Sequence, residues 1–334
     1  MEKEVYRDLL QDEIIQDMKI KFDIKVNSVS PLDWNYGNVC WIMNSDRGGL
    51  FVKVHDKIRN TRTMEGTRQA LKYQDQMHFA DIPCQPVLSY KGEYTYVTLT
   101  GEEYTITGAS EGKHIDAGQA NPSQLFSLGK ATGRMHNWLK KNLPHNELPN
   151  WELKSKEIMN TRLEKNLQET MFAEHDRYVD AIIRQMDILQ HIDLGELRTC
   201  SRGWAHWDMH IDNLMFRDDQ IADIIDFDRI SYVYTDFDIS RSLLSCALTS
   251  NGFPLENVRA YVDGYSESTI LTADRIARSL KLTWYKECKW VHAKYSKNRP
   301  MSRFIEELIW IGENWDCLEE VFKEIIKYPD NISY

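Results

Sequence analysis

Residues 206–228 read HWDMHIDNLMFRDDQIADIIDFD, in which two short apolar runs flank a polar turn at residues 217–219. This pattern predicts a β-hairpin. Because a hairpin returns the chain to where it began, Asn213 at the start of the first strand should lie near Asp226 at the end of the second. Asp208 lies just upstream of Asn213. The segment therefore predicts a polar site that is assembled around a hairpin.

The residues of this segment favour a magnesium site over a zinc site. His206 and His210 have the i, i+4 spacing of a zinc-binding helix, but Trp207 stands where the metalloprotease signature requires glutamate. No third nitrogen or sulfur ligand is nearby, as a zinc site would need. The oxygen donors of Asn213 and Asp226 suit Mg²⁺, which takes few carboxylates and binds substrate phosphates. We expect the metal to carry a nucleotide.

The first hundred residues predict a small antiparallel sheet with one helix. Short β-branched and aromatic runs at 25–32, 39–44 and 50–55 are separated by turn residues. A helical pattern begins at Met64 and should end before Ile82-Pro83, because the residue before proline disfavours helix. Further strands are expected at 84–90, 94–99 and 102–108.

The rest of the chain is predicted to be mainly helical. Asn121-Pro122-Ser123-Gln124 combines an N-cap residue, proline at the first helical position and glutamine at the third. Apolar residues then follow with helical spacing: Leu125, Leu128, Thr132, Met135 and Leu139. Residues 151–192 and 254–328 give further helical patterns.

The motif His206-x-Asp208-x-x-x-x-Asn213, followed after a hairpin by Ile-Asp-Phe-Asp, resembles the aminoglycoside phosphotransferase and choline kinase superfamily. Upstream LGKATGRMHNWL and downstream DFDISRSLL are also similar to that family, and the resemblance covers about residues 27–266. It implies an α+β, protein-kinase-like fold. An N-lobe at 1–107 would bind nucleotide, 108–113 would form a hinge, and 114–334 would form a helical C-lobe with the catalytic loop.

The resemblance implies a role for each residue of the motif. Asp208 would be the catalytic base, and Asn213 and Asp226 would hold Mg²⁺ on the phosphates of ATP. His206, Asp228 and Asp238 would support the site, with Asp228 bracing its loop or reaching a second metal. The family usually has a small residue where this chain has Trp207.

The same resemblance implies a nucleotide site in the N-lobe. Lys53, in the third strand, would bind the α- and β-phosphates. Its carboxylate partner would be Glu65, because this is the only glutamate between Lys53 and Gly92. The turn at 33–38, with Gly37, would cover the phosphates. The backbone of Gly108 and Ser110 would hydrogen-bond the adenine edge.

Composition excludes some functions. The net charge of −10 and the pI near 5.5 speak against a nucleic-acid partner and favour a cationic, amine-bearing acceptor. Six separated cysteines predict reduced thiols rather than a metal knuckle. There is no apolar run long enough to cross a membrane, and the charged N-terminus does not resemble a signal peptide. The sequence thus predicts a cytoplasmic protein without a membrane partner.

Residues 281–299 interleave basic and aromatic side chains, as nucleic-acid-binding segments do. However, Trp284, Cys288, Val291 and Tyr295 have the spacing of one helical stripe. Lys286, Lys289 and Lys297 lie largely off that stripe. The pattern favours a core-facing helix with a solvated basic face.

These features together predict an ATP-dependent kinase that phosphorylates a hydroxyl of a small molecule. The acceptor could be an amino-sugar antibiotic, an amino alcohol, a homoserine-like compound or a sugar metabolite. One alternative is a catalytically inactive kinase-fold protein, such as a spore-coat-type binding module, but it would have no chemical need for Lys53, Asp208, Asn213 and Asp226 together. A protein kinase is disfavoured because the chain after Asp228 leaves no room for an activation loop.

Overall fold

The computed structural model describes residues 2–32, 38–55 and 64–326. The predicted phosphate-covering turn at 33–38, with Gly37, falls almost entirely outside these residues. The chain divides into two compact units. Unit 1 comprises residues 1–113, 215–217 and 222–229, and unit 2 comprises residues 114–214, 218–221 and 230–334. Unit 2 begins at residue 114, directly after the predicted hinge at 108–113, but residues 215–217 and 222–229, which were expected in the C-lobe, cluster with unit 1.

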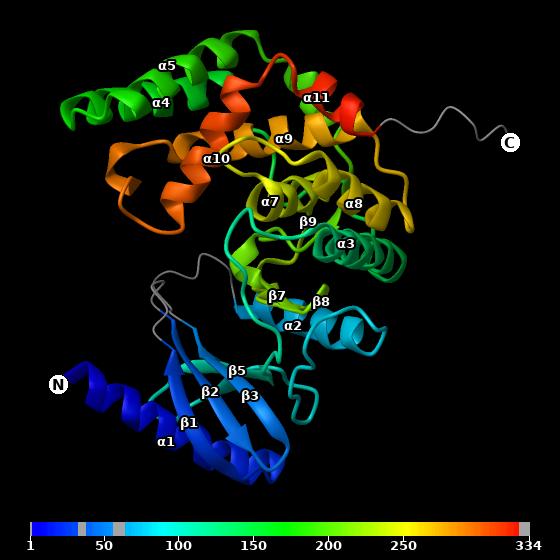
Figure 1. The fold of residues 1–334 in the computed structure, drawn as a ribbon. Helices are drawn as coiled ribbons and strands as arrows, with labels where there is room; N and C mark the ends of the chain where they lie inside the picture. The colour runs from blue at the N-terminus through cyan, green and yellow to red at the C-terminus, as the bar shows by residue number, and fades with distance from the viewer. Residues whose placement is uncertain (1, 33–37, 56–63, 327–334) are drawn as a thin grey trace, which may run out of the picture. The chain divides into compact units, whose positions relative to one another are not determined.

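Unit 1 is built on a five-stranded antiparallel sheet with the strand order β1-β2-β3-β5-β4 (Figure 1). Its elements are α1 (Glu2–Phe22), β1 (Val26–Leu32), β2 (Val39–Ser45), β3 (Gly48–Val54), α2 (Met64–His78), β4 (Tyr96–Val97) and β5 (Glu103–Gly108). The three predicted N-terminal strands and the helix from Met64 are confirmed. The predicted strand at 84–90 is wrong: it forms only isolated bridges, at Val87 and Tyr90.

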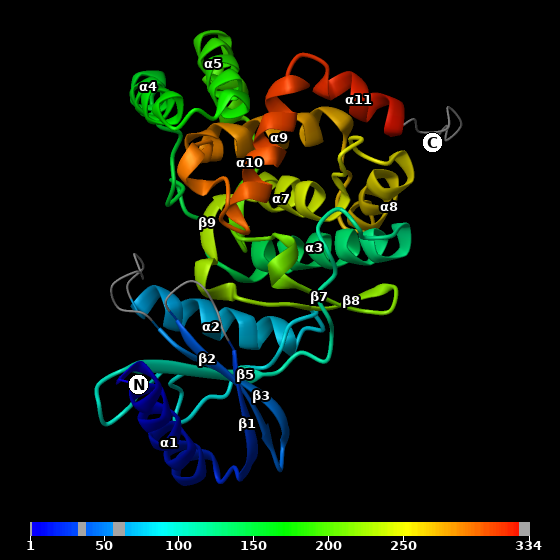
Figure 2. The ribbon, with the colours of Figure 1, turned by 60° about the vertical axis from the view of Figure 1, so that its left-hand side comes forward.

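Helix α1 was not predicted, and it covers one face of this sheet. Leu10, Ile14 and Met18 recur every four residues and are almost fully buried in one cluster with Trp41 and Val52 of the sheet. Figure 2 shows the sheet running between α1 and α2. The helix therefore closes a hydrophobic core that the strands alone could not complete.

Unit 2 is mainly helical. They are α3 (Pro122–Asn142), α4 (Lys156–Phe172), α5 (Asp176–His191), α6 (Leu194–Arg198), β6 (Arg202–Ala205), β9 (Ser231–Tyr234), α7 (Asp236–Ala247), α8 (Leu255–Ser266), α9 (Ala273–Glu287), α10 (Met301–Glu313) and α11 (Leu318–Ile325). Strands β7 (Leu214–Arg217) and β8 (Gln220–Ile224) form the predicted hairpin.

Helix α3 begins as its sequence predicts. The Asn121 side chain accepts a hydrogen bond from the Gln124 backbone N–H, and the Gln124 side chain accepts one from the Asn121 backbone, so that a complete capping box is present. The five residues of the predicted apolar stripe are all buried. Where α3 crosses α8, a Cβ at Gly129 would collide with the Tyr261 carbonyl oxygen, so only glycine allows this close approach.

The predicted helix through residues 284–295 is wrong in its length. Helix α9 ends at Glu287, and two 3₁₀ turns follow, at Cys288–Trp290 and Ala293–Tyr295. Trp284, Cys288 and Val291 are nevertheless fully buried, as a core-facing stripe requires. Among the described residues, no helix is long and apolar enough to span a membrane, and all six cysteines are free thiols.

Candidate active site

The part of the site in unit 1 is organised by Lys53 on β3. Its Nζ lies 2.8 Å from Asp226 Oδ1 and 2.7 Å from Asp228 Oδ2. Burial opposes the charge of this lysine, but the two aspartates outweigh that cost and raise its pKa above the ordinary value. The ammonium is therefore held in its charged form where a phosphate-binding cation is expected.

The structure corrects the predicted partner of Lys53. Glu65, in the first turn of α2, forms an ion pair with Arg68 at 3.4 Å, and its side chain is 79% exposed. Lys53 instead pairs with Asp226 and Asp228. The sequence also offered Asp226 and Asp228, on either side of Phe227, as partners. It could not show which of these two aspartates and Glu65 lies nearest to Lys53.

Asp228 and a histidine that the sequence analysis missed complete this part of the site. His55 is almost fully buried, and its Nδ1 lies 3.7 Å from the Asp228 carboxylate. Its Nε2 lies 3.2 Å from the hydroxyl of Thr105. Burial lowers the pKa of His55. Asp228 thus contacts Lys53 and His55, as a residue that braces the loop would.

The loop of Asp226 has an unusual backbone. Asp226 adopts φ +63°, in the left-handed region that side chains other than glycine, asparagine and aspartate rarely occupy. Phe227 after it is completely buried and starts a 3₁₀ turn, Phe227–Arg229. The buried phenyl ring anchors the turn, so that the aspartates on either side of it both reach Lys53.

The predicted hinge is tied to the hairpin. The Ser110 hydroxyl donates to Asp223, and Gln85 Nε2 donates to both oxygens of that carboxylate at 2.9 Å. Lys113 and Phe216 exchange two backbone hydrogen bonds, at 2.7 and 2.8 Å. The Gly108 N–H donates to the Pro86 carbonyl at 2.9 Å, so this backbone group already has an acceptor.

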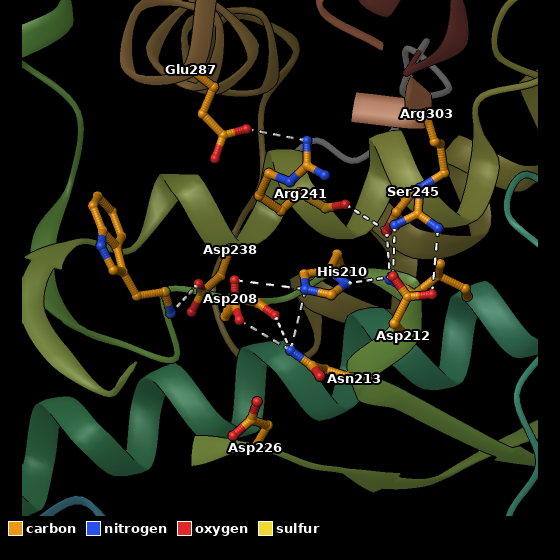
Figure 3. Close-up of polar contacts among 12 residues, drawn as sticks. Asp208, His210, Asp212, Asn213, Asp226, Asp238, Arg241, Ser245, Glu287 and Arg303 are labelled. Atoms are coloured by element: carbon orange, nitrogen blue, oxygen red, sulfur yellow. Dashed lines mark hydrogen bonds and ion pairs between the residues drawn. The ribbon is translucent and has the colours of Figure 1, made fainter. Parts of the chain in front are cut away.

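In unit 2, the loop between β6 and β7, which carries Asp208, is held by Asp238, the third residue of α7. The carboxylate of Asp238, which Figure 3 labels, accepts the backbone N–H groups of His206 at 2.7 Å and Trp207 at 2.8 Å. His136 Nε2, from α3, lies 3.1 Å from the same carboxylate. Asp238 and His206 are completely buried, which fits the predicted supporting roles.

Asp208 and Asn213 face each other across this loop. Asn213 Nδ2 lies 2.9 Å from the Asp208 carbonyl oxygen and 3.3 Å from its carboxylate. These contacts fix which end of the amide is nitrogen, and they leave Oδ1 as the end that can bind a cation. Amide and carboxylate oxygens are donors that Mg²⁺ accepts, and Asn213 in unit 2 and Asp226 in unit 1 supply one of each kind. No cluster of three or more histidine, cysteine or acidic ligands occurs in the described part of the chain.

His210 lies between two acidic residues of the same loop. Its Nδ1 is 3.1 Å from Asp212, and its Nε2 is 3.7 Å from Asp208. Arg303 of α10 lies 2.9 Å from Asp212 on the other side. Burial opposes the charge of His210, but the hydrogen bonds to Asp208 and Asp212 outweigh it and raise the pKa of His210 to about 9.

This raised pKa predicts a pH-dependent contribution of His210 to stability. A folded-state pKa above the unfolded value of about 6.5 stabilises the fold fully below pH 6.5, and this stabilisation disappears as pH rises towards 9. We therefore expect the loss of unfolding free energy in His210→Asn to reach at most about 3 kcal/mol near pH 6 and to shrink by pH 9. Urea unfolding of both proteins across this range measures it. A difference that is constant with pH would contradict the expectation.

The backbone of Trp207 adopts a conformation that favours a smaller residue. Its φ is +68°, a conformation that glycine adopts freely and that costs other residues of order 1–3 kcal/mol. Packing offsets this cost, because the indole lies 4.5 Å from the ring of Phe237 and 5.7 Å from that of Trp151.

Asp236, the first residue of α7, has a structural role. It is completely buried and 2.8 Å from Arg275. It also accepts the Ser201 N–H at 3.0 Å.

The chain belongs to the phosphotransferase enzyme family, whose model matches residues 28–274. It is a small-molecule phosphotransferase of the protein-kinase-like fold. No curated protein shows significant sequence similarity to the chain.

Solved structures of this fold resemble the chain at low sequence identity. An amicoumacin kinase in complex with AMP-PNP and Ca²⁺ is 17% identical, with a TM-score of 0.59 and coverage of 94% of this chain and 96% of the other. A microcompartment-associated aminopropanol kinase is 13% identical, with a TM-score of 0.58 and coverage of 92% and 98%. Choline kinase from Cryptosporidium parvum is 12% identical, with a TM-score of 0.57 and coverage of 95% and 98%.

Proposed function

We propose that this phosphotransferase moves the γ-phosphate of ATP to a hydroxyl of a small molecule. The observation that carries the proposal is the pairing of Lys53 with Asp226, at 2.8 Å. This pairing brings together Lys53, which would bind the nucleotide phosphates, and Asp226, which would bind the metal on those phosphates. The use of ATP is supported by the amicoumacin kinase and by a spectinomycin phosphotransferase, which were solved with AMP-PNP and with ADP.

Each residue has a task that its chemistry allows. Asn213 and Asp226 would hold Mg²⁺, which neutralises charge on the phosphates when it is bound. Lys53 would leave part of its pairing with Asp226 and Asp228 to bind the α- and β-phosphates. Asp208 would orient the acceptor hydroxyl and take its proton, while Asn213 fixes the loop that carries it. Phosphoryl transfer depends more on such positioning than on proton abstraction.

The alternative of an inactive kinase-fold binding protein has less support. Binding alone would not require Asp208, nor a charged His210 beside it. A protein kinase is also disfavoured, because β9 begins at Ser231, three residues after Asp228, and leaves no activation loop.

A panel of acceptors tests the proposal. The purified protein with MgATP should release ADP only when a suitable hydroxyl compound is added, and the phosphorylated product should be visible by mass spectrometry. The panel includes amino-sugar antibiotics, amino alcohols, hydroxy amino acids and sugars. ADP release that is unaffected by every acceptor, in a protein that binds MgATP, would count against a kinase and for the binding module.

A further inference from the structure

The ammonium of Lys286, at the end of α9, lies against two aromatic rings of the catalytic region. Its Nζ is 3.7 Å from the ring centre of Phe237 and 4.5 Å from that of Trp207. The side chain is only 17% exposed. This corrects the sequence analysis, which placed Lys286 on a solvated helical face. Aromatic faces replace part of the water that such a cation loses on burial.

Lys286 is also the end of a chain of alternating charges in unit 2. The ion pairs run from Lys286 to Glu287, Arg241, Glu307, Arg303, Asp212, His210 and Asp208. Figure 3 shows the pair of Glu287 with Arg241 and the pairs that lead from Arg303 through Asp212 and His210 to Asp208. Within this network of ion pairs, each carboxylate lies between two basic groups, except for Asp208, which ends the network. Glu287 uses one oxygen for Lys286, at 3.2 Å, and the other for Arg241, at 3.5 Å. Glu287 is therefore not a free site for a cationic substrate group.

Lys286 has more hydrogen-bonding capacity than its contacts use. An ammonium carries three N–H donors. Among the described residues, its one carboxylate partner is Glu287. Its other contacts are the faces of the Phe237 and Trp207 rings. Trp207 directly precedes Asp208 in the sequence. A donor group thus remains beside Trp207, and Asp208, the residue proposed to receive the acceptor hydroxyl, lies near enough for its charge to act on the pKa of Lys286.

The geometry points to Lys286 as a specificity residue that binds an oxyanion, such as a carboxylate, on the phosphate acceptor. This inference rests on the proposed function and refines the acceptor class. It holds whether or not the acceptor also carries an amine. Burial lowers the pKa of Lys286, an effect that the charges of Glu287 and Asp208 only partly offset. A bound oxyanion would supply the missing compensation.

Matched acceptors that differ only in a carboxylate test the inference. Serine and ethanolamine form one such pair, and homoserine and 3-aminopropan-1-ol form another. We expect the wild-type protein to prefer the carboxylate member of a pair by about 10- to 100-fold in kcat/KM, which is the range for one charge-assisted hydrogen bond. Binding of the same compounds in the presence of AMP-PNP, measured by saturation-transfer NMR, gives a second readout.

Lys286→Met removes the charge and keeps much of the length of the side chain. It should abolish the preference by raising KM for the carboxylate members alone, and Lys286→Arg should restore part of it. Lys281→Met is the control, because Lys281 lies on the same helix with a similar environment. It pairs with Glu196 at 3.4 Å and lies 5.5 Å from the ring centre of Trp315.

The outcomes separate the two proposals. Turnover or binding of amino alcohols equal to that of their carboxylate partners would overturn the role of Lys286 and leave the kinase intact. An equal loss for both members in Lys286→Met would assign the residue to structure and also overturn it. Absence of acceptor-dependent turnover throughout the broader panel would instead refute the proposed function.

Discussion

Asp208→Asn should lower kcat by about 10²- to 10⁴-fold, the range for loss of a positioned general base. Asparagine keeps the size of the side chain but cannot accept the proton of the acceptor hydroxyl. The Asp208 carbonyl, 2.9 Å from Asn213 Nδ2, is unaffected by the substitution, so the loop should keep its shape. We therefore expect the affinity for MgATP to be unchanged. Coupled ADP release gives kcat, and calorimetric titration gives the affinity.

A matched control for this variant is Asp187→Asn on α5. The Asp187 side chain is 75% exposed and lies 3.8 Å from His191 on the same helix. Its replacement should leave both kcat and nucleotide affinity at wild-type values. Full activity in Asp208→Asn would remove this residue from the mechanism, whatever the acceptor proves to be.

Lys53→Met should weaken MgATP binding and lower kcat/KM for ATP by about 100-fold or more, since several charge-assisted contacts to phosphate would be lost at once. The variant should also lose about 1–3 kcal/mol of unfolding free energy. Asp226 and Asp228, whose side chains are 29% and 20% exposed, would then lose the cation that both of them contact. Calorimetry measures the affinity, and urea unfolding of the free protein measures the stability.

Two further variants make the Lys53 experiment specific. Lys72→Met removes an exposed lysine from α2 of the same unit and should have no effect. Glu65→Gln tests the pair that the family resemblance implied, and it should leave the unfolding free energy within about 0.5 kcal/mol, because Glu65 is exposed. A loss of stability in Glu65→Gln as large as that in Lys53→Met would contradict the pairing described here.

Local signals in the sequence predicted their elements correctly. The capping box at Asn121 and the hairpin turn at Asp218 depend on residues within a few positions of each other, and both elements formed as predicted. The family motif is local as well, because it lies within residues 206–228. Helix α1 was missed although Leu10, Ile14 and Met18 are regularly spaced. Charged residues separate these three apolar residues in the sequence and obscure the helical pattern. The three side chains form a buried stripe only because they pack against the sheet.

The charge network shows what periodicity alone cannot determine. Lys286, Glu287, Arg303 and Glu307 all lie after residue 274, where the family match ends. Their ion pairs reach Arg241, Asp212 and His210. Nothing in the spacing of α9 or α10 reveals these partners, since a helical pattern gives the face of a residue and not what packs against it.

The sequence by itself determined the class of the protein, because strand lysine, His-x-Asp-x-x-x-x-Asn, hairpin and Asp-Phe-Asp occur in the order that the family uses. Tertiary structure decided which charges meet: Lys53 pairs with Asp226 and Asp228 rather than Glu65, and Lys286 is buried against Trp207 and Phe237. The physical reason is how far apart in the sequence the interacting residues lie. Turns, caps and motifs are set by neighbours in the chain, whereas the pairing and pKa of a buried charge depend on distances between residues far apart in sequence.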